Sequence, residues 1–178
     1  RSRYDFRYEE NDKDFYKIRQ GLDESIVNKI SEEKHDPAWM KEFRLKSLKL
    51  FNEINEPDWG PNIKDLDIQK IVTYVKPKTE MAAKWADVPK DIKDTFEKLG
   101  IPDAERESLA GVGAQYDSEL VYHNVKDEVS EQGVVYTDME SALTGPYAAM
   151  VQEYFMHLVP PTDHKFAALH GAVWSGGS

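Results

Sequence analysis

Two glycines, Gly111 and Gly113, lie in the part of the sequence that best suits phosphate chemistry. A glycine-rich loop that binds a dinucleotide follows a strand, opens a helix and carries a third glycine for close packing. Here a helix-like segment precedes Gly111, and Tyr116 stands at the third glycine position. We therefore do not expect a nucleotide-binding loop here. We expect Gly111 to occupy the C′ position at the end of a helix and Gly113 to provide a second flexible position in the turn.

Acidic and histidine side chains follow these glycines directly. Asp117, Glu119 and His123 are of the types that bind Zn²⁺ and similar ions, so a small carboxylate/histidine metalloenzyme is one hypothesis. The other hypothesis, which we favour, is a buried hydrogen-bond network that fixes a turn. None of the histidines falls in the H-E-x-x-H spacing of metal-binding helices, so we expect surface or capping roles for them. The five are His35, His123, His157, His164 and His170.

The amino-acid composition excludes several classes of functional site. The 178 residues include no cysteine, which excludes disulfides, thiolate-bound metals and cysteine nucleophiles from this sequence. The formal net charge of -10 argues against a nucleic-acid surface, which needs clustered lysine and arginine. The densest basic group, Lys41, Arg44, Lys46 and Lys49, has helical spacing and is expected on a solvated helix face.

No membrane or export signal is evident in the sequence. No apolar run approaches the roughly 20 residues that cross a bilayer. The first 19 residues are charged and aromatic and contain no apolar signal-peptide core. We therefore expect a cytoplasmic protein that makes no membrane contact.

The elements that position these residues are predicted to be mainly helical. Asp23 is a plausible N-cap for a helix over 22–36, with Ile26, Val27 and Ile30 on one face. Pro37 suits the first turn of a second helix, and Pro57 lies beyond its end. Its apolar face is predicted from Trp39, Phe43, Leu50 and Ile54, beside Met40, Leu48 and Phe51.

Further helices are predicted over 89–100, 102–110, 124–133 and 145–161, and Asp138 is a possible cap. The 145–161 helix would bury Tyr147, Val151, Tyr154, Phe155 and Leu158. Residues 68–75 fit a helical turn or a strand equally well. The fold class is mainly α, within α+β.

Three regions are expected along the chain. Residues 1–20 form an extended or partly disordered arm, and residues 21–165 form a helical module. Residues 166–178 are apolar, β-leaning and rich in glycine at their end. This pattern is typical of the start of a further β element, so we expect the chain to be a fragment of a longer protein.

Five blocks of sequence carry a resemblance to a known family. They are "SEEKHDPAWMKEFRLKSL", "DIQKIVTYVKPK", "VPKDIKDTFEKLGIPDAERESLAGVGAQYDSELVYHNV", "EQGVVYTDMESAL" and "VQEYFMHLVPPTDHKFAALHGAVWSGGS". Together they cover nearly everything from Gly21 to Ser178. The chain resembles the N-terminal region of the SufB family, scaffold subunits of the SUF iron–sulfur cluster assembly system and paralogues of SufD.

The resemblance implies a helical module in front of a right-handed parallel β-helix, which would begin near 166–178. It implies a scaffold rather than an enzyme, and an iron–sulfur cluster on the full-length protein but no cofactor on this segment. The implied partners are SufD or a second SufB, the SufC ATPase and a cysteine desulfurase or sulfur-transfer protein. Separated from the β-helix, the segment is expected to self-associate.

No catalytic, cofactor-binding or metal-binding residue is carried over by the resemblance, because the family's cluster-building cysteines lie outside this segment. The module's expected role is to cap the β-helix or to dock a partner. The family-characteristic positions with an expected structural role are Gly111, Gly113, Gln115, Tyr116, Asp117, Tyr122, His123, Asn124 and Trp174.

Overall fold

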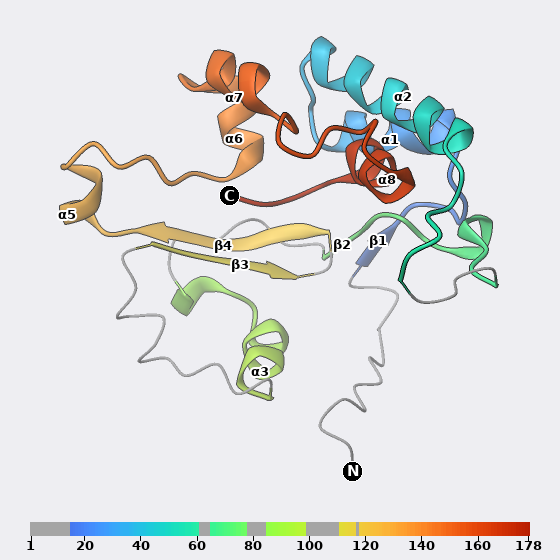
Figure 1. Ribbon diagram of the computed structural model, residues 1–178. Coiled ribbons are helices and arrows are strands. Elements are labelled where there is room, and N and C mark those ends of the chain that lie inside the picture. The colour runs from blue at the N-terminus through green and yellow to red at the C-terminus, as the bar shows by residue number, and fades with distance from the viewer. Residues whose placement is uncertain (1–14, 61–64, 78–84, 99–110, 117) are drawn as a thin grey trace.

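Most helices lie on one side of a short β-hairpin, helix α3 (Lys90–Lys98) lies on the other side, and the C-terminal segment runs between the larger group of helices and the hairpin (Figure 1). The computed structural model describes residues 15–60, 65–77, 85–98, 111–116 and 118–178. Most of the described elements are helices, joined by two small antiparallel sheets. The predicted mainly helical class is therefore confirmed.

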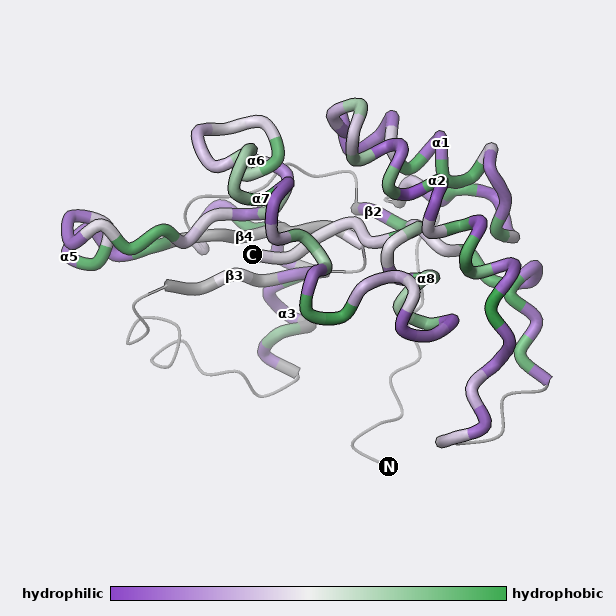
Figure 2. Tube along the Cα trace, turned by 45° about the horizontal axis from the view of Figure 1, so that its top comes forward, coloured by the Kyte–Doolittle hydropathy of each residue, from purple (hydrophilic) through white to green (hydrophobic). Residues whose placement is uncertain are grey.

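Helix α1 (Glu24–Glu33) begins where the sequence predicts. The carboxylate of Asp23 accepts a hydrogen bond from the Ile26 amide at 3.0 Å, which satisfies one of the free N–H groups of the first turn. Ile26, Val27 and Ile30 are buried on one side. Apolar and polar residues alternate along α1 and α2, as expected for helices with one face on the core (Figure 2).

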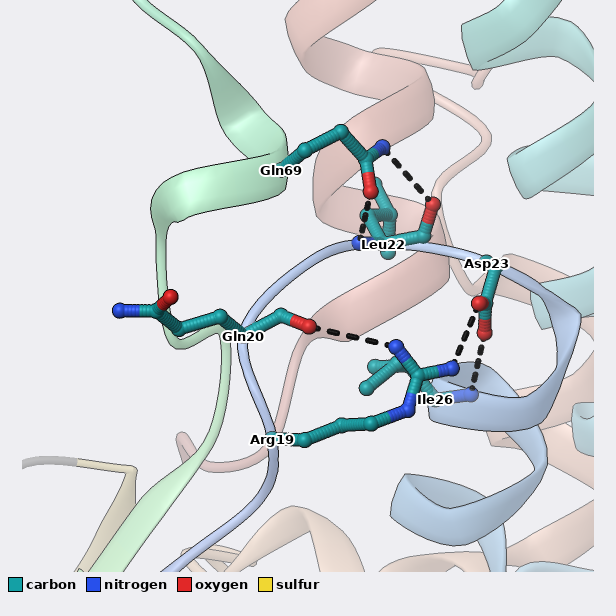
Figure 3. A network of polar contacts seen from close by, with 6 residues as sticks. All are labelled: Arg19, Gln20, Leu22, Asp23, Ile26 and Gln69. Atoms are coloured by element: carbon teal, nitrogen blue, oxygen red, sulfur yellow. Dashed lines mark hydrogen bonds and ion pairs between the residues drawn. The ribbon is translucent and has the colours of Figure 1, made fainter.

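The entry to α1 is held by a polar network (Figure 3). Arg19 Nη2 donates to Asp23 at 2.6 Å, and this bond is the main reason that the pKa of Asp23 is lowered. The Gln69 amide group bonds both the N–H and the C=O of Leu22. Gly21 has a φ of +103°, and a Cβ there would lie 2.9 Å from the Gln69 side chain. Glycine is thus required where the arm meets α1.

Helix α2 (Ala38–Glu53) follows Pro37 as predicted, but it buries a different face. The buried residues are Met40, Arg44, Ser47, Leu48 and Phe51. The predicted residues Trp39, Phe43, Leu50 and Ile54 flank this face and are only partly buried. The polar residues Arg44 and Ser47 therefore lie on the buried face. Arg44 bonds a carbonyl of another helix, whereas Ser47 Oγ donates to the Phe43 carbonyl within α2 at 2.8 Å and packs against a glycine of that other helix.

That other helix is α8 (Lys165–Val173), so the predicted β-leaning stretch over 166–178 is wrong for residues 166–173. Alanines at 167, 168 and 172 favour helix, and the His164 ring caps the N-terminus by accepting from two backbone amides. A Cβ on Gly171 would lie 2.5 Å from Ser47 Oγ, so α8 approaches α2 closely at this point. Buried residues of α1, α2 and α8 form the main core, with Leu22 and Tyr74.

Residues 68–75, whose sequence fitted a helical turn and a strand equally well, contain one turn of helix and the start of a strand. A 3-10 turn, η2 (Ile68–Lys70), is followed by strand β2 (Val75–Pro77). β2 pairs antiparallel with β1 (Phe15–Lys17), so the predicted extended arm ends in a strand. Residues 1–14 lie outside the described residues.

Gly111 and Gly113 lie in a β-hairpin and not at the end of a helix. Strand β3 (Gly111–Tyr116) pairs antiparallel with β4 (Glu119–Val125), and the register shifts between Ala114 and Gln115. The C′ role predicted for Gly111 is therefore wrong, because Gly111 begins a strand. The helix predicted over 102–110 lies outside the described residues.

Three of the remaining helices, at 90–98, 127–130 and 148–154, are shorter than predicted, and two, at 85–87 and 139–144, lie where no helix was predicted. They are η3 (Trp85–Asp87), α3 (Lys90–Lys98), α5 (Asp127–Ser130), α6 (Met139–Thr144) and α7 (Ala148–Tyr154). Asp138 caps α6 as expected, accepting from Ser141 N at 2.8 Å. The helix predicted over 145–161 ends at Tyr154, and Tyr154 and Leu158 are exposed rather than buried. Within the described ranges, no helix has the length and apolar character needed to span a membrane.

Candidate functional site

A fully buried arginine lies at the centre of the helical layer. Arg44 Nε donates to Asp36 Oδ2 at 2.6 Å, Nη2 lies 3.4 Å from Oδ1, and neither side chain is exposed to solvent. This two-point contact matches the guanidinium to the carboxylate and neutralises a charge that burial would otherwise penalise strongly. Asp36 lies just before α2, so the pair also fixes how the chain enters this helix.

The third nitrogen of the same guanidinium, Nη1, binds the C-terminal segment. Arg44 Nη1 donates to the carbonyl of Trp174 at 2.7 Å and lies 3.4 Å from that of Ala172. The last carbonyls of a helix have no partner within the helix, and Arg44 supplies one. The guanidinium also lies 4.7 Å from the centroid of the Trp174 ring, within range of a cation–π contact.

Trp174 joins this cluster to a second apolar core. Its ring centroid is 5.2 Å from that of Phe155, and it packs with Met40 and Leu143. The indole N–H is buried and finds no hydrogen-bond partner among the described residues. The ring is therefore held by packing and by Arg44 rather than through its own polar atom.

Beyond Trp174 the chain passes between α6 and the hairpin (Figure 1). The Met139 amide donates to the Gly177 carbonyl at 3.0 Å, and Gly177 has a φ of +139°. A Cβ on Gly176 would lie 3.4 Å from the Gln115 side chain of β3. We call residues 174–178 together with Arg44 and Asp36 the C-terminal clamp.

The hairpin holds most of the positions singled out from the sequence. Gly111, Gly113, Gln115 and Tyr116 are on β3, and Tyr122, His123 and Asn124 are on β4. The register pairs Gly113 with His123. Gln115 lies beside Gly176, so the hairpin and the segment that begins with Trp174 are brought together. Asp117 lies outside the described residues.

The metalloenzyme alternative gains no geometric support from this hairpin. Glu119 and His123 are four positions apart on β4, on either side of the register shift, and their Cα atoms are at most roughly 13 Å apart, the separation in a regular strand. A single zinc ion holds its nitrogen and oxygen ligands at about 2 Å. Among the residues that the structure describes, no group of three histidine or acidic side chains is placed to hold a metal ion.

Sequence reasoning missed Arg44 and Asp36. Arg44 was predicted on a solvated face with Lys41, Lys46 and Lys49, and it is wholly buried, whereas the three lysines are exposed. The available signal was its spacing, since Arg44 lies midway between Met40 and Leu48 on the buried stripe. A charge at such a position indicates a paired, buried group.

Two histidines on α8 have defined environments. His164 caps the helix through Nδ1, as expected for a capping histidine, with both amides at 3.1 Å. Burial lowers the pKa of His170, and the nearby positive charge of Arg44 lowers it further. Lys165 is the first residue of α8, next to His164. Its ammonium donates to the carbonyls of Phe51 and Ile54, and so caps the C-terminus of α2.

Comparison with known proteins yields relatives over almost the whole chain. An iron–sulfur cluster assembly SufBD family protein of Staphylococcus epidermidis is 47% identical over 175 residues, which are 98% of this chain and 37% of the relative. A SufBD family protein of Staphylococcus aureus strain USA300 gives the same identity and coverage. The chain is a homologue of SufBD family proteins.

This SufBD homologue spans 37% of the length of those curated relatives. The resemblance found in the sequence is therefore confirmed at the level of SufBD proteins, and the comparisons do not separate SufB from SufD. No protein-family model matches the chain. No solved structure matches it either.

Proposed function

We propose that this chain is a SufB-type member of the SufBD family and acts as the helical module of an iron–sulfur cluster assembly scaffold. The observation that carries the proposal is the 47% identity to SufBD family proteins over 98% of the chain. On this proposal the protein is not itself an enzyme. It supports an assembly whose ATPase and desulfurase activities belong to other subunits.

The proposed partners follow from the same homology. They are SufD or a second SufB, the SufC ATPase and a cysteine desulfurase or sulfur-transfer protein, in the cytoplasm. The iron–sulfur cluster is cargo of the whole assembly, and its thiolate ligands would come from outside this sequence, which contains no cysteine.

The module's own role is proposed to be capping of a β-helix. Each strand of the β3–β4 hairpin has one edge without a β partner among the described residues. Such an edge readily pairs with further strands. The C-terminal clamp brings residues 174–178 alongside this hairpin, which supports a role for the hairpin in covering the first turn of a solenoid. In this proposal the β-helix begins after α8 and not at residue 166.

Depletion of the protein in its source organism tests the scaffold role. We expect the activity of an iron–sulfur enzyme such as aconitase to fall, while a dehydrogenase without a cluster keeps its activity. The aconitase apoprotein should accumulate and regain activity on chemical reconstitution. Equal activities of both enzymes before and after depletion would reject the proposal.

A further inference from the structure

A cavity of about 470 Å³ opens where α7 ends and α8 begins. Its wall includes the side chains of Tyr154, Met156 and Phe166, with buried Ala167 in its lining. The volume falls within the range of protein ligand sites, about 300–1,000 Å³. The cavity is separate from the hairpin that carries the family-characteristic residues, and the scaffold proposal makes no use of it.

Three of the apolar side chains that line this cavity also protrude into solvent. Leu158 is 99% exposed, Tyr154 is 64% exposed and Val159 is 51% exposed. We call these three residues together with the cavity the α7–α8 surface. Contiguous exposed apolar groups of this kind mark sites where another protein binds. A small molecule enclosed in the cavity would leave the protruding side chains uncovered, so a protein segment fits the surface better.

The backbone at this surface is held in an unfavourable conformation. Met156 has a φ of +53°, which a side chain with a Cβ seldom adopts and which costs on the order of 1–3 kcal/mol. This residue lies two positions after the end of α7 and is followed directly by the exposed residues 157–159. Strain of this type persists where the surrounding structure requires it, and here it accompanies the exposure of Leu158.

Acidic groups border the α7–α8 surface. Glu153 is exposed beside Tyr154, and Asp163 Oδ2 lies 3.8 Å from the ring of His164, which lines the cavity. Exposed Asp58 precedes Trp59, whose ring packs edge-on against His164 at 5.4 Å. The ammonium of Lys165, next along the chain, is engaged by carbonyls of α2. These bonds orient Lys165 toward α2 but leave its charge in place, so the border carries three carboxylates against one ammonium and is negative on balance.

We propose that the α7–α8 surface binds a partner segment that presents a large apolar side chain flanked by lysine or arginine. The apolar residue would enter the cavity, and the cations would face Glu153, Asp163 and Asp58. A second copy of this chain is a poorer occupant, because two surfaces bordered by acids on molecules of charge -10 repel each other. The inference does not depend on the scaffold role.

Peptide binding to the purified protein tests this assignment. The probe is a fluorescein-labelled peptide with one central tryptophan flanked by lysines, and the readout is fluorescence anisotropy. Matched probes replace tryptophan with serine or lysine with glutamate. We expect Tyr154→Ser combined with Leu158→Ser to weaken binding about tenfold, as loss of a central apolar contact does. Glu153→Gln with Asp163→Asn should weaken binding and reduce its salt dependence.

Matched variants at other surface positions control for non-specific apolar binding of the peptide and for the change in net charge. Leu66→Ser and Val135→Ser remove apolar groups that are 52% and 51% exposed, and Asp87→Asn with Glu131→Gln removes two exposed acids. These variants should bind as the unmodified protein does. Equal losses in both sets would overturn the proposal, as would unchanged binding in the cavity variants. Dimerisation abolished by the Leu158 variant would instead assign the surface to a second copy and also overturn it.

Discussion

Arg44 holds Trp174 in two ways at once, by a 2.7 Å hydrogen bond to its carbonyl and by a guanidinium that lies 4.7 Å from the centre of its ring. One side chain therefore fixes both the backbone and the orientation of the residue where α8 ends. Because Asp36 neutralises the same guanidinium, the position of the C-terminal segment depends on an ion pair at the start of α2.

Arg44→Met is expected to destabilise the protein by about 3–5 kcal/mol, because it leaves Asp36 buried without its counter-charge. Asp36→Asn should cost less, since it removes the charge and keeps a hydrogen-bonding group. The double variant Arg44→Met with Asp36→Leu should recover part of the loss. Urea unfolding followed by circular dichroism measures all three, and a loss below about 1 kcal/mol for Arg44→Met would contradict the buried pair.

Gly171→Ala tests the close contact between α2 and α8. In a helix this change normally stabilises by up to about 1 kcal/mol. Here the added Cβ would lie 2.5 Å from Ser47 Oγ, so we expect destabilisation of about 1–3 kcal/mol instead. The melting temperature reports the sign. Adding Ser47→Ala should relieve part of the loss, and a melting temperature above that of the unmodified protein would show that the helices are not in contact.

His170 should make folding sensitive to mild acid. Its pKa is lowered in the folded protein, whereas an unfolded chain protonates histidine near about 6.5. The unfolded state therefore takes up this proton first, and stability falls as the pH drops from about 7 toward the folded pKa, then levels off below it. His170→Gln should reduce the loss of the urea midpoint between pH 7.5 and 5.5. The exposed His157→Gln variant is the control and should keep the full loss.

Metal analysis separates the scaffold hypothesis from the metalloenzyme hypothesis. We expect the purified protein to contain substoichiometric zinc, iron and manganese, and chelator treatment to leave its melting temperature unchanged. One equivalent of metal that disappears in His123→Ala would favour the alternative centred on Asp117, Glu119 and His123.

The accuracy of the sequence-based predictions depends on the range of the interactions involved. Asp23 and Asp138 were predicted as N-caps because a cap acts within three residues, and both predictions are confirmed. The hairpin was missed because its paired glycine-containing strands were interpreted as a loop after a helix. The helical state of residues 165–173 was missed because an apolar segment of this length is ambiguous without its packing partner.

The candidate site was predicted only in part, for a similar reason. Sequence motifs pointed to the hairpin and Trp174, which the structure brings together through Gln115 and Gly176. Arg44 was grouped with its neighbouring lysines on a solvated face, because the carbonyls of Ala172 and Trp174 that it bonds lie far along the chain. Its position between Met40 and Leu48 was the local signal that this grouping left out. The resemblance to SufBD proteins came from long blocks of sequence and not from any catalytic pattern.

The distance along the chain between the two halves of the C-terminal clamp also affects biosynthesis. The bonds from Arg44 to Ala172 and Trp174 join residues 128 and 130 positions apart. On a translating ribosome, α1 and α2 emerge first and must wait until almost the entire sequence described here has been made before their core can close. A nascent chain at that stage exposes the apolar face of α2, and Arg44 has Asp36 beside it but lacks the carbonyls of Ala172 and Trp174. The protein should therefore depend on chaperones that shield early folding intermediates, and slow synthesis of the stretch between α2 and α8 should increase that dependence.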